Sequence, residues 1–209
     1  MKYKLLKLLF LAFLFIGQSA YAIEPLSIKY VDPKASEKAD SLYNKAQRLY
    51  AQKKYQEAIL LYEESYEYKP SKDIPANTGI SYKHIGEYDK ACSWYEIGVK
   101  KFNDNKSALN LALLYEEKLN DIDKSIMWYL TSIKLGNIDA RKGLGLLYHQ
   151  QKDKLNSATY MIGMIGHPYT KERVLGLLRN DWKIDEPTLK KAYELQKTLV
   201  PNPYTGGID

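Results

Sequence analysis

The sequence predicts an all-α fold in which antiparallel helix hairpins stack into a solenoid, because two columns of residues repeat in one register. In the first column, a small residue is followed three positions later by a large one, and the pair recurs at a constant spacing. In the second column, the paired residues lie four positions apart, and they recur at the same spacing to within a single position. A fixed period of this length is typical of repeat architectures. The first column pairs Ala46 with Leu49, Gly79 with Tyr82, Ala112 with Tyr115 and Gly145 with Tyr148; the second pairs Ala58 with Tyr62, Ala91 with Tyr95, Ser125 with Tyr129 and Ala158 with Ile162.

The residue types in both columns suit two helices that pack closely. A small residue on one helix lets its partner approach, and the large residue one turn further along fills the gap between the ridges. A single hairpin leaves one apolar face uncovered. The next hairpin covers that face, so neighbouring units stabilise each other.

The helix boundaries follow from the two columns and from the turn residues between them. Four first helices are expected near residues 38–52, 74–85, 106–118 and 138–150, and four second helices near residues 55–68, 88–101, 121–135 and 155–165. Asp73, Asn103 and Asn137 stand before first helices, where capping side chains belong. A break is expected at Gly166-His167-Pro168.

Two more helices are expected after this break, near residues 172–180 and 186–199. Ala192 follows Ala158 by one further repeat length, so these helices are interpreted as a degenerate fifth unit that caps the stack. The predicted organisation is an extended segment at 23–37, four repeats at 38–168, a capping helix pair at 169–200 and an extended tail at 201–209.

The repeat residues resemble the tetratricopeptide repeat family. Ala58-x3-Tyr62 with a later Pro70 is similar to the second half of that repeat, and Leu144-Gly145-x2-Tyr148 is similar to its first half. The stretch from Trp128 to Tyr148 resembles the Sel-like variant, with its Trp-Tyr pair, its Gly-Asn pair and its Ala-x3-Leu-Gly-x2-Tyr motif. The resemblance covers about residues 38–168 and implies a right-handed solenoid. The consensus tryptophan of the first helix is replaced by Leu42, Pro75, Ala108 and Arg141.

The segment 1–22 has the order of a secretory signal peptide. Lys2, Lys4 and Lys7 form a basic segment, residues 8–16 form an apolar run, and Ala20-Tyr21-Ala22 is a small-residue cleavage site. Cleavage after Ala22 and a periplasmic or secreted location are therefore expected. The alternative is an uncleaved membrane anchor, but the apolar run is shorter than the roughly 20 residues that span a bilayer. No stable membrane insertion is expected after cleavage.

Charge and motifs exclude several function classes. Loss of three lysines and no acid would lower the formal charge from +6 to +3, which gives little support to a nucleic-acid partner. The single Cys92 cannot form an internal disulfide. No histidine has a second histidine or a cysteine at helical spacing, and no catalytic, P-loop or dinucleotide motif occurs. We therefore expect no metal, no cofactor and no enzymatic activity.

The family resemblance implies that one face of the first helices lines a concave groove. An apolar strip of Ile80, Leu109, Leu113 and Leu146 is flanked there by charged and aromatic positions, and an exposed apolar strip is typical of a peptide or helix groove. The alternative is that the strip is core, or is covered by the chain's own end. The candidate binding residues are Tyr43, Tyr50, Ile80, Lys83, Leu109, Leu113, Glu116, Leu146 and His149; Lys142 projects to the same face.

The expected function is that of an exported scaffold or adaptor that holds an envelope protein or peptide in this groove. A regulator or immunity-type protein that binds one enzyme through its convex face or helix ends is the first alternative. A cell-wall hydrolase is the second alternative, and it would require a site that no sequence motif reveals.

Overall fold

The computed structural model describes residues 32–200 and 203–208, and the chain divides into two units, Met1–Asp32 and Pro33–Asp209. The expected signal peptide and residues 23–31 of the expected extended segment lie outside the described residues. The second unit holds all the described helices.

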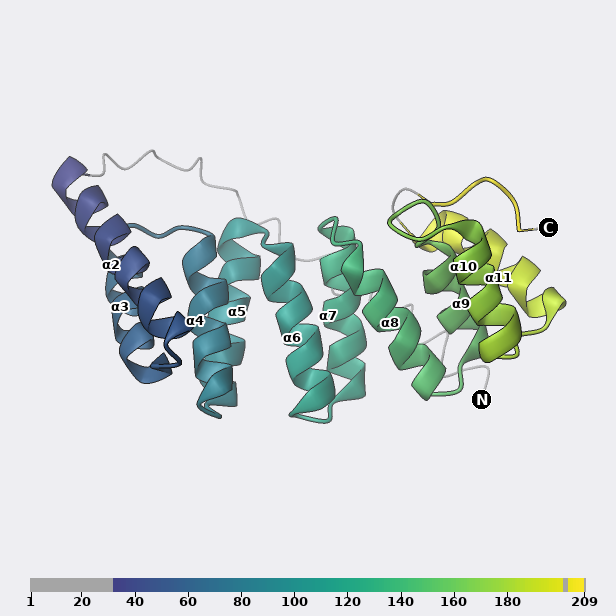
Figure 1. Ribbon diagram of the computed structural model, residues 1–209, viewed down its shortest axis with the longest axis horizontal. Helices are drawn as coiled ribbons and strands as arrows, with labels where there is room; N and C mark the ends of the chain where they lie inside the picture. The colour runs from purple at the N-terminus through teal and green to yellow at the C-terminus, as the bar shows by residue number, and fades with distance from the viewer. Residues whose placement is uncertain (1–31, 201–202, 209) are drawn as a thin grey trace, which may run out of the picture. The chain divides into compact units, whose positions relative to one another are not determined.

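The described residues form ten α-helices and one π-helical segment, and none of them lies in a β-strand (Figure 1). Each helix expected from the two residue columns is present, with bounds within a few residues of the expected ones. The helices are α2 (Pro33–Ala51), α3 (Tyr55–Tyr68), α4 (Asp73–His84), α5 (Tyr88–Phe102), α6 (Asn105–Glu117), α7 (Ile122–Lys134), α8 (Asp139–Gln150), α9 (Lys154–Ile162), α10 (Lys171–Gly176), the π-helical η1 (Leu177–Asp181) and α11 (Glu186–Leu199).

The first helix begins earlier than expected, so the prediction of an extended segment is wrong for residues 33–37. Pro33 opens α2, where its fixed φ suits a helix and its missing N–H is no loss. Lys69, the residue that follows α3, links the first turn of α2 to the end of α3. Its Nζ donates to the hydroxyl of Ser36 at 2.9 Å.

Helices pack mainly with their neighbours in the chain. The hairpins α2–α3, α4–α5, α6–α7 and α8–α9 form the four units, and α3–α4, α5–α6 and α7–α8 join one unit to the next. The first helices α4 and α6 also contact each other directly. Figure 1 shows α2 to α9 following one another in chain order, as nearest-neighbour stacking requires.

The small-residue column lies where helices approach most closely. Ala46, Gly79, Ala112 and Gly145 are all buried. A Cβ atom built on Gly79 would lie 2.5 Å from a ring carbon of Tyr95, which is itself fully buried. The aromatic residue of the second column therefore fills the space that the first column leaves.

The turn inside each unit contains one residue in the left-handed backbone region. These residues are Lys53 with φ 61°, Gly86 with φ 81°, Asn120 with φ 52° and Lys152 with φ 60°. The left-handed conformation reverses the chain after a helix end. Because three of the four positions are lysine or asparagine, no column of glycines marks this turn in the sequence.

The C-terminal helices depart from the repeat pattern. The helix α10 continues directly into η1, and α11 makes its main helix contact with α9. Thr170 and Asp185 cap α10 and α11 by accepting hydrogen bonds from the backbone N–H groups of Arg173 and Thr188.

The described tail residues, 203–208, lie on the C-terminal helices. The side chain of Gln196 accepts from the backbone N–H of Tyr204 at 3.1 Å and donates to its carbonyl at 2.6 Å. Arg179 donates to the carbonyl of Ile208 at 2.9 Å, and the Ile208 side chain is buried in the same core cluster as Leu178 and Ala192. Residues 203–208 lie in no helix or strand, and their hydrogen bonds are with α11 and η1.

Candidate functional site

The nine candidate binding residues occupy repeated positions on the first helices α2, α4, α6 and α8, and none of them is fully buried. We call this set the first-helix face. Eight members are half-buried and Leu146 is exposed. The small-residue column of the same helices is buried, so the predicted face is the accessible side. The members are Tyr43, Tyr50, Ile80, Lys83, Leu109, Leu113, Glu116, Leu146 and His149.

The apolar strip on this face is partly the edge of the core. Leu109 and Leu113 are half-buried against the cluster that contains Tyr129 and Leu144, and Ile80 is half-buried against the cluster around Tyr95. Leu146 belongs to neither cluster and leaves 39% of its surface exposed. Leu146 is therefore the strip residue with the most apolar surface to offer a partner.

Two polar members of the face are held by internal hydrogen bonds. The Tyr43 hydroxyl accepts from the side-chain amides of Gln47 at 2.7 Å and Asn77 at 2.9 Å. The Glu116 carboxylate accepts from the hydroxyl of the buried Tyr129 at 2.7 Å. The bonds of Tyr43 join the first helices α2 and α4, and the bond of Glu116 joins α6 to the second helix α7.

Tyr50 belongs to an aromatic cluster that closes the turn of the first unit. Its hydroxyl oxygen lies 3.2 Å from Nε2 of His84, and its ring lies 5.4 Å from the ring of Tyr55. The imidazole of His84 stacks on Tyr55 with the ring centroids 4.4 Å apart and the planes 5° from parallel. Burial raises the pKa of Tyr50, and burial together with Lys83 lowers the pKa of His84.

The lowered pKa of His84 predicts a stability that falls in mild acid. The folded protein favours the neutral imidazole, so this contribution is complete above about pH 6.5 and is lost as the pH falls through the lowered pKa. His84→Phe keeps a ring against Tyr55 but cannot be protonated. The loss of melting temperature between pH 7.5 and pH 5 should therefore be smaller in His84→Phe than in the wild type. An equal loss in both proteins would show that His84 does not contribute.

His149, at the end of α8, stacks on Trp182, which directly follows η1. The ring centroids are 4.0 Å apart and the planes are 11° from parallel. This contact joins the last member of the first-helix face to the C-terminal helices. No sequence pattern indicates it, because it depends on how the capping helices pack.

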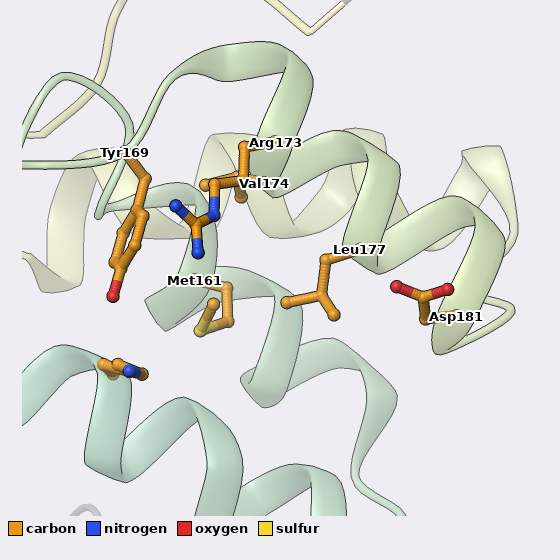
Figure 2. Close-up of a pocket in the computed structure, with 7 residues that line it drawn as sticks. Met161, Tyr169, Arg173, Val174, Leu177 and Asp181 are labelled. Atoms are coloured by element: carbon orange, nitrogen blue, oxygen red, sulfur yellow. The ribbon is translucent and has the colours of Figure 1, made fainter.

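A pocket of about 260 Å³ lies where α8, α9 and α10 meet (Figure 2). The cations of Lys142 and Arg173 lie 5.9 Å and 5.0 Å from the ring centroid of Tyr169. Met161, Val174 and Leu177 form its apolar lining, and Asp181 completes it. The sequence alone projects Lys142 to the groove side, whereas it does not indicate a role for Tyr169, Arg173 or Asp181.

Metal-binding clusters and membrane-crossing helices are both absent from the described residues. No group of three or more histidine, cysteine or carboxylate side chains in the described part of the chain could hold a metal ion. Among the same residues, no helix combines the length and the apolar character that crossing a membrane requires.

A comparison with solved structures relates the stacked hairpins to a known fold. The chain is similar to the crystal structure of a tetratricopeptide repeat protein from Parabacteroides merdae ATCC 43184, with a TM-score of 0.57 and 16% sequence identity. The match covers 77% of this chain and 66% of the other. The fold is that of the tetratricopeptide repeat. The predicted all-helical solenoid of stacked hairpins is thereby confirmed.

Two further comparisons are weaker: one structure has a lower TM-score, and one sequence match covers less of this chain. MamA of AMB-1 has a TM-score of 0.49 at 19% identity, over 77% of this chain and 92% of that one. The rhomboid protease GluP of Bacillus subtilis (strain 168) is 41% identical over 85 residues, which are 40% of this chain. The chain spans only 17% of the length of GluP. No protein-family model matches the chain.

Proposed function

We propose that this chain is a protein-binding scaffold that holds a segment of a partner protein against its first-helix face. The observation that supports this most directly is the accessibility of that face. Repeated positions on four stacked helices are all partly open, and they include the exposed apolar side chain of Leu146. Exposed apolar surface beside polar residues is typical of protein interaction sites.

The proposed partner is an envelope protein, met after export. The signal-peptide pattern of residues 1–22 supports export to the periplasm or beyond, where envelope proteins are the available partners. On this proposal the chain is an adaptor and not an enzyme, and it needs no cofactor or metal.

One observation favours the alternative of an enzyme regulator that uses the second helices. Leu60 on α3 leaves 64% of its surface exposed, and Met127 on α7 is also exposed. These two residues occupy equivalent repeat positions, but the position between them in α5 is the polar Ser93. Tyr68 on α3 and Leu130 on α7 are exposed as well. The polar Ser93 interrupts this surface, whereas the first-helix face has partly open positions on four successive first helices, so we take the first-helix face as the stronger candidate.

Leu146→Glu tests the proposal with little risk to the fold. The leucine is exposed, so the substitution should leave the helical circular dichroism and the melting temperature close to those of the wild type. A leucine that a partner buries contributes roughly 1.5–3 kcal/mol, and the new carboxylate would be desolvated in the contact. The affinity for a partner identified by crosslinking in envelope extract should fall more than tenfold, as measured by calorimetry.

Leu60→Glu is the matched control, because it places the same charge on an exposed leucine of a second helix. The proposal expects it to bind the partner like the wild type. Loss of binding in Leu60→Glu with full binding in Leu146→Glu would contradict the proposal and favour the regulator alternative. Leu113→Glu is a poorer test, since Leu113 packs against the core.

A further inference from the structure

The pocket between α8, α9 and α10 has different chemistry at its two ends. Figure 2 shows Tyr169 and Arg173 toward one end, Asp181 at the other, and Leu177 between them. Lys142 reaches the Tyr169 ring from α8, so two cations share one aromatic ring. Met161 is buried beneath the middle of the pocket. The order along the pocket is therefore cationic, apolar and anionic.

The three charged residues of this pocket are exposed to solvent, and none of them forms an ion pair within the described residues. Neither Nζ of Lys142 nor the guanidinium of Arg173 forms an ion pair there, and the Asp181 carboxylate accepts no hydrogen bond. The carboxylate of Glu186, by contrast, is paired with Arg179 at 2.6 Å. Two like charges beside one ring repel each other, and an anionic ligand group would relieve that repulsion.

The spacing of the charges limits what could satisfy both ends. Arg173 and Asp181 are eight positions apart on the continuous helix formed by α10 and η1, which corresponds to about 12 Å. An extended chain rises about 3.3 Å per residue, and every second side chain lies on the same face. An acidic side chain, an apolar side chain two positions later and a basic side chain four positions later would thus match the three parts of the pocket.

We propose that this pocket binds an extended peptide segment with the pattern acid–x–apolar–x–base. The acid meets Lys142 and Arg173, the apolar side chain lies on Met161 and Leu177, and the base meets Asp181. The volume of about 260 Å³ suits side chains of such a segment rather than an enclosed small molecule, whose pockets hold roughly 300–1,000 Å³. The inference rests on the proposed function in one respect: Lys142 lies on α8, so a segment held here continues onto the first-helix face.

The direct test uses a blocked pentapeptide and the methyl signal of Met161. The probe is acetyl-Glu-Ser-Leu-Ser-Lys-amide, and the protein is the full chain labelled with [¹³C-methyl]methionine. We expect a saturable shift of the Met161 methyl resonance with a Kd of about 1 mM, because the contact is small and partly exposed. The methyl of Met127, exposed on α7, should not move.

Matched substitutions on both partners assign the contacts. Arg173→Gln should raise the Kd for the probe peptide roughly fivefold. A peptide with glutamine in place of glutamate should bind the wild-type protein with a Kd raised by the same factor. When Arg173→Gln is combined with the glutamine peptide, the Kd should be little higher than with either change alone, since both changes remove the same interaction. Asp181→Asn should show the same coupling to the peptide lysine. Lys191→Gln, on the exposed side of α11, is the control and should leave the Kd unchanged.

Two results would overturn the pocket inference. One is the absence of any saturable Met161 shift up to about 10 mM peptide, an affinity too weak to matter for a segment of a partner. The other is equal affinity of the glutamate and glutamine peptides. Neither result touches the Leu146→Glu experiment, so failure of the pocket and failure of the proposed function remain distinguishable.

Discussion

Replacing Gly79 with leucine is expected to destabilise the protein by about 3 kcal/mol or more. Its Cβ alone would lie 2.5 Å from the Tyr95 ring, which is fully buried and cannot turn away. Gly145→Leu, in the same column, meets the Met161 side chain at 2.9 Å. A methionine adapts its shape easily, so this second variant should lose only about 1–3 kcal/mol. Chemical denaturation monitored by circular dichroism gives both values.

Gly176→Ala is the control for these substitutions. Its Cβ meets nothing within 4 Å, and its helical φ of −58° suits alanine, so it should be neutral or slightly stabilising. Hydrogen exchange in Gly79→Leu should rise mainly in α3 to α6, because each unit is stabilised by its neighbours. Exchange that rises equally along the chain, or a larger loss for Gly145→Leu, would contradict this packing scheme.

Arg141→Ala is expected to cost about 2–4 kcal/mol of stability. Arg141 is only 3% exposed, and its guanidinium donates to the carbonyl of Gly163 at 2.7 Å, just past the end of α9. The side chain of Val200, at the end of α11, packs on Gly163 as well. Removing the guanidinium would leave a cavity and an unsatisfied carbonyl where α8, α9 and α11 meet.

Arg48→Ala is the matched control for Arg141→Ala, because Arg48 is exposed on α2 and makes a local contact with the carbonyl of Asn44. It should change the free energy of unfolding by less than about 0.5 kcal/mol. Equal effects of the two substitutions in a urea titration would show that the buried guanidinium does not hold the last repeat together.

The helices are predictable from the sequence because the repeat period imposes one pattern four times. The columns at Ala46 and Ala58 and their equivalents set the register, whereas the expected cap Asp73 is the first residue of α4 and makes no capping bond. The sequence places Asn103 as the cap of α6, and this is wrong: Asn103 is the left-handed residue that ends α5, and the side chain of Asp104 caps α6 instead. Residue types alone do not separate two adjacent capping residues, since either can accept from the first helical N–H groups.

The first-helix face is predictable for the same reason, whereas its contacts are not. Periodicity places Tyr50, Leu146 and His149 on the accessible side of their helices. It cannot show that His84 and Tyr55 stack beside Tyr50, or that Trp182 returns to cover His149, because these contacts depend on tertiary packing. The pocket residues Tyr169, Arg173 and Asp181 escape prediction because the loop before α10, α10 and η1 lie outside the repeat pattern.

The central claim, that the first-helix face binds a partner protein, is tested most directly by site-specific photocrosslinking. A benzophenone amino acid replaces Leu146 in one protein and Leu60 in another, both exposed leucines. The two proteins are irradiated in envelope extract. The account predicts that one discrete protein is crosslinked from position 146 and not from position 60, and that an excess of unlabelled wild-type chain suppresses the crosslink. Crosslinking of that protein from position 60 alone would contradict it.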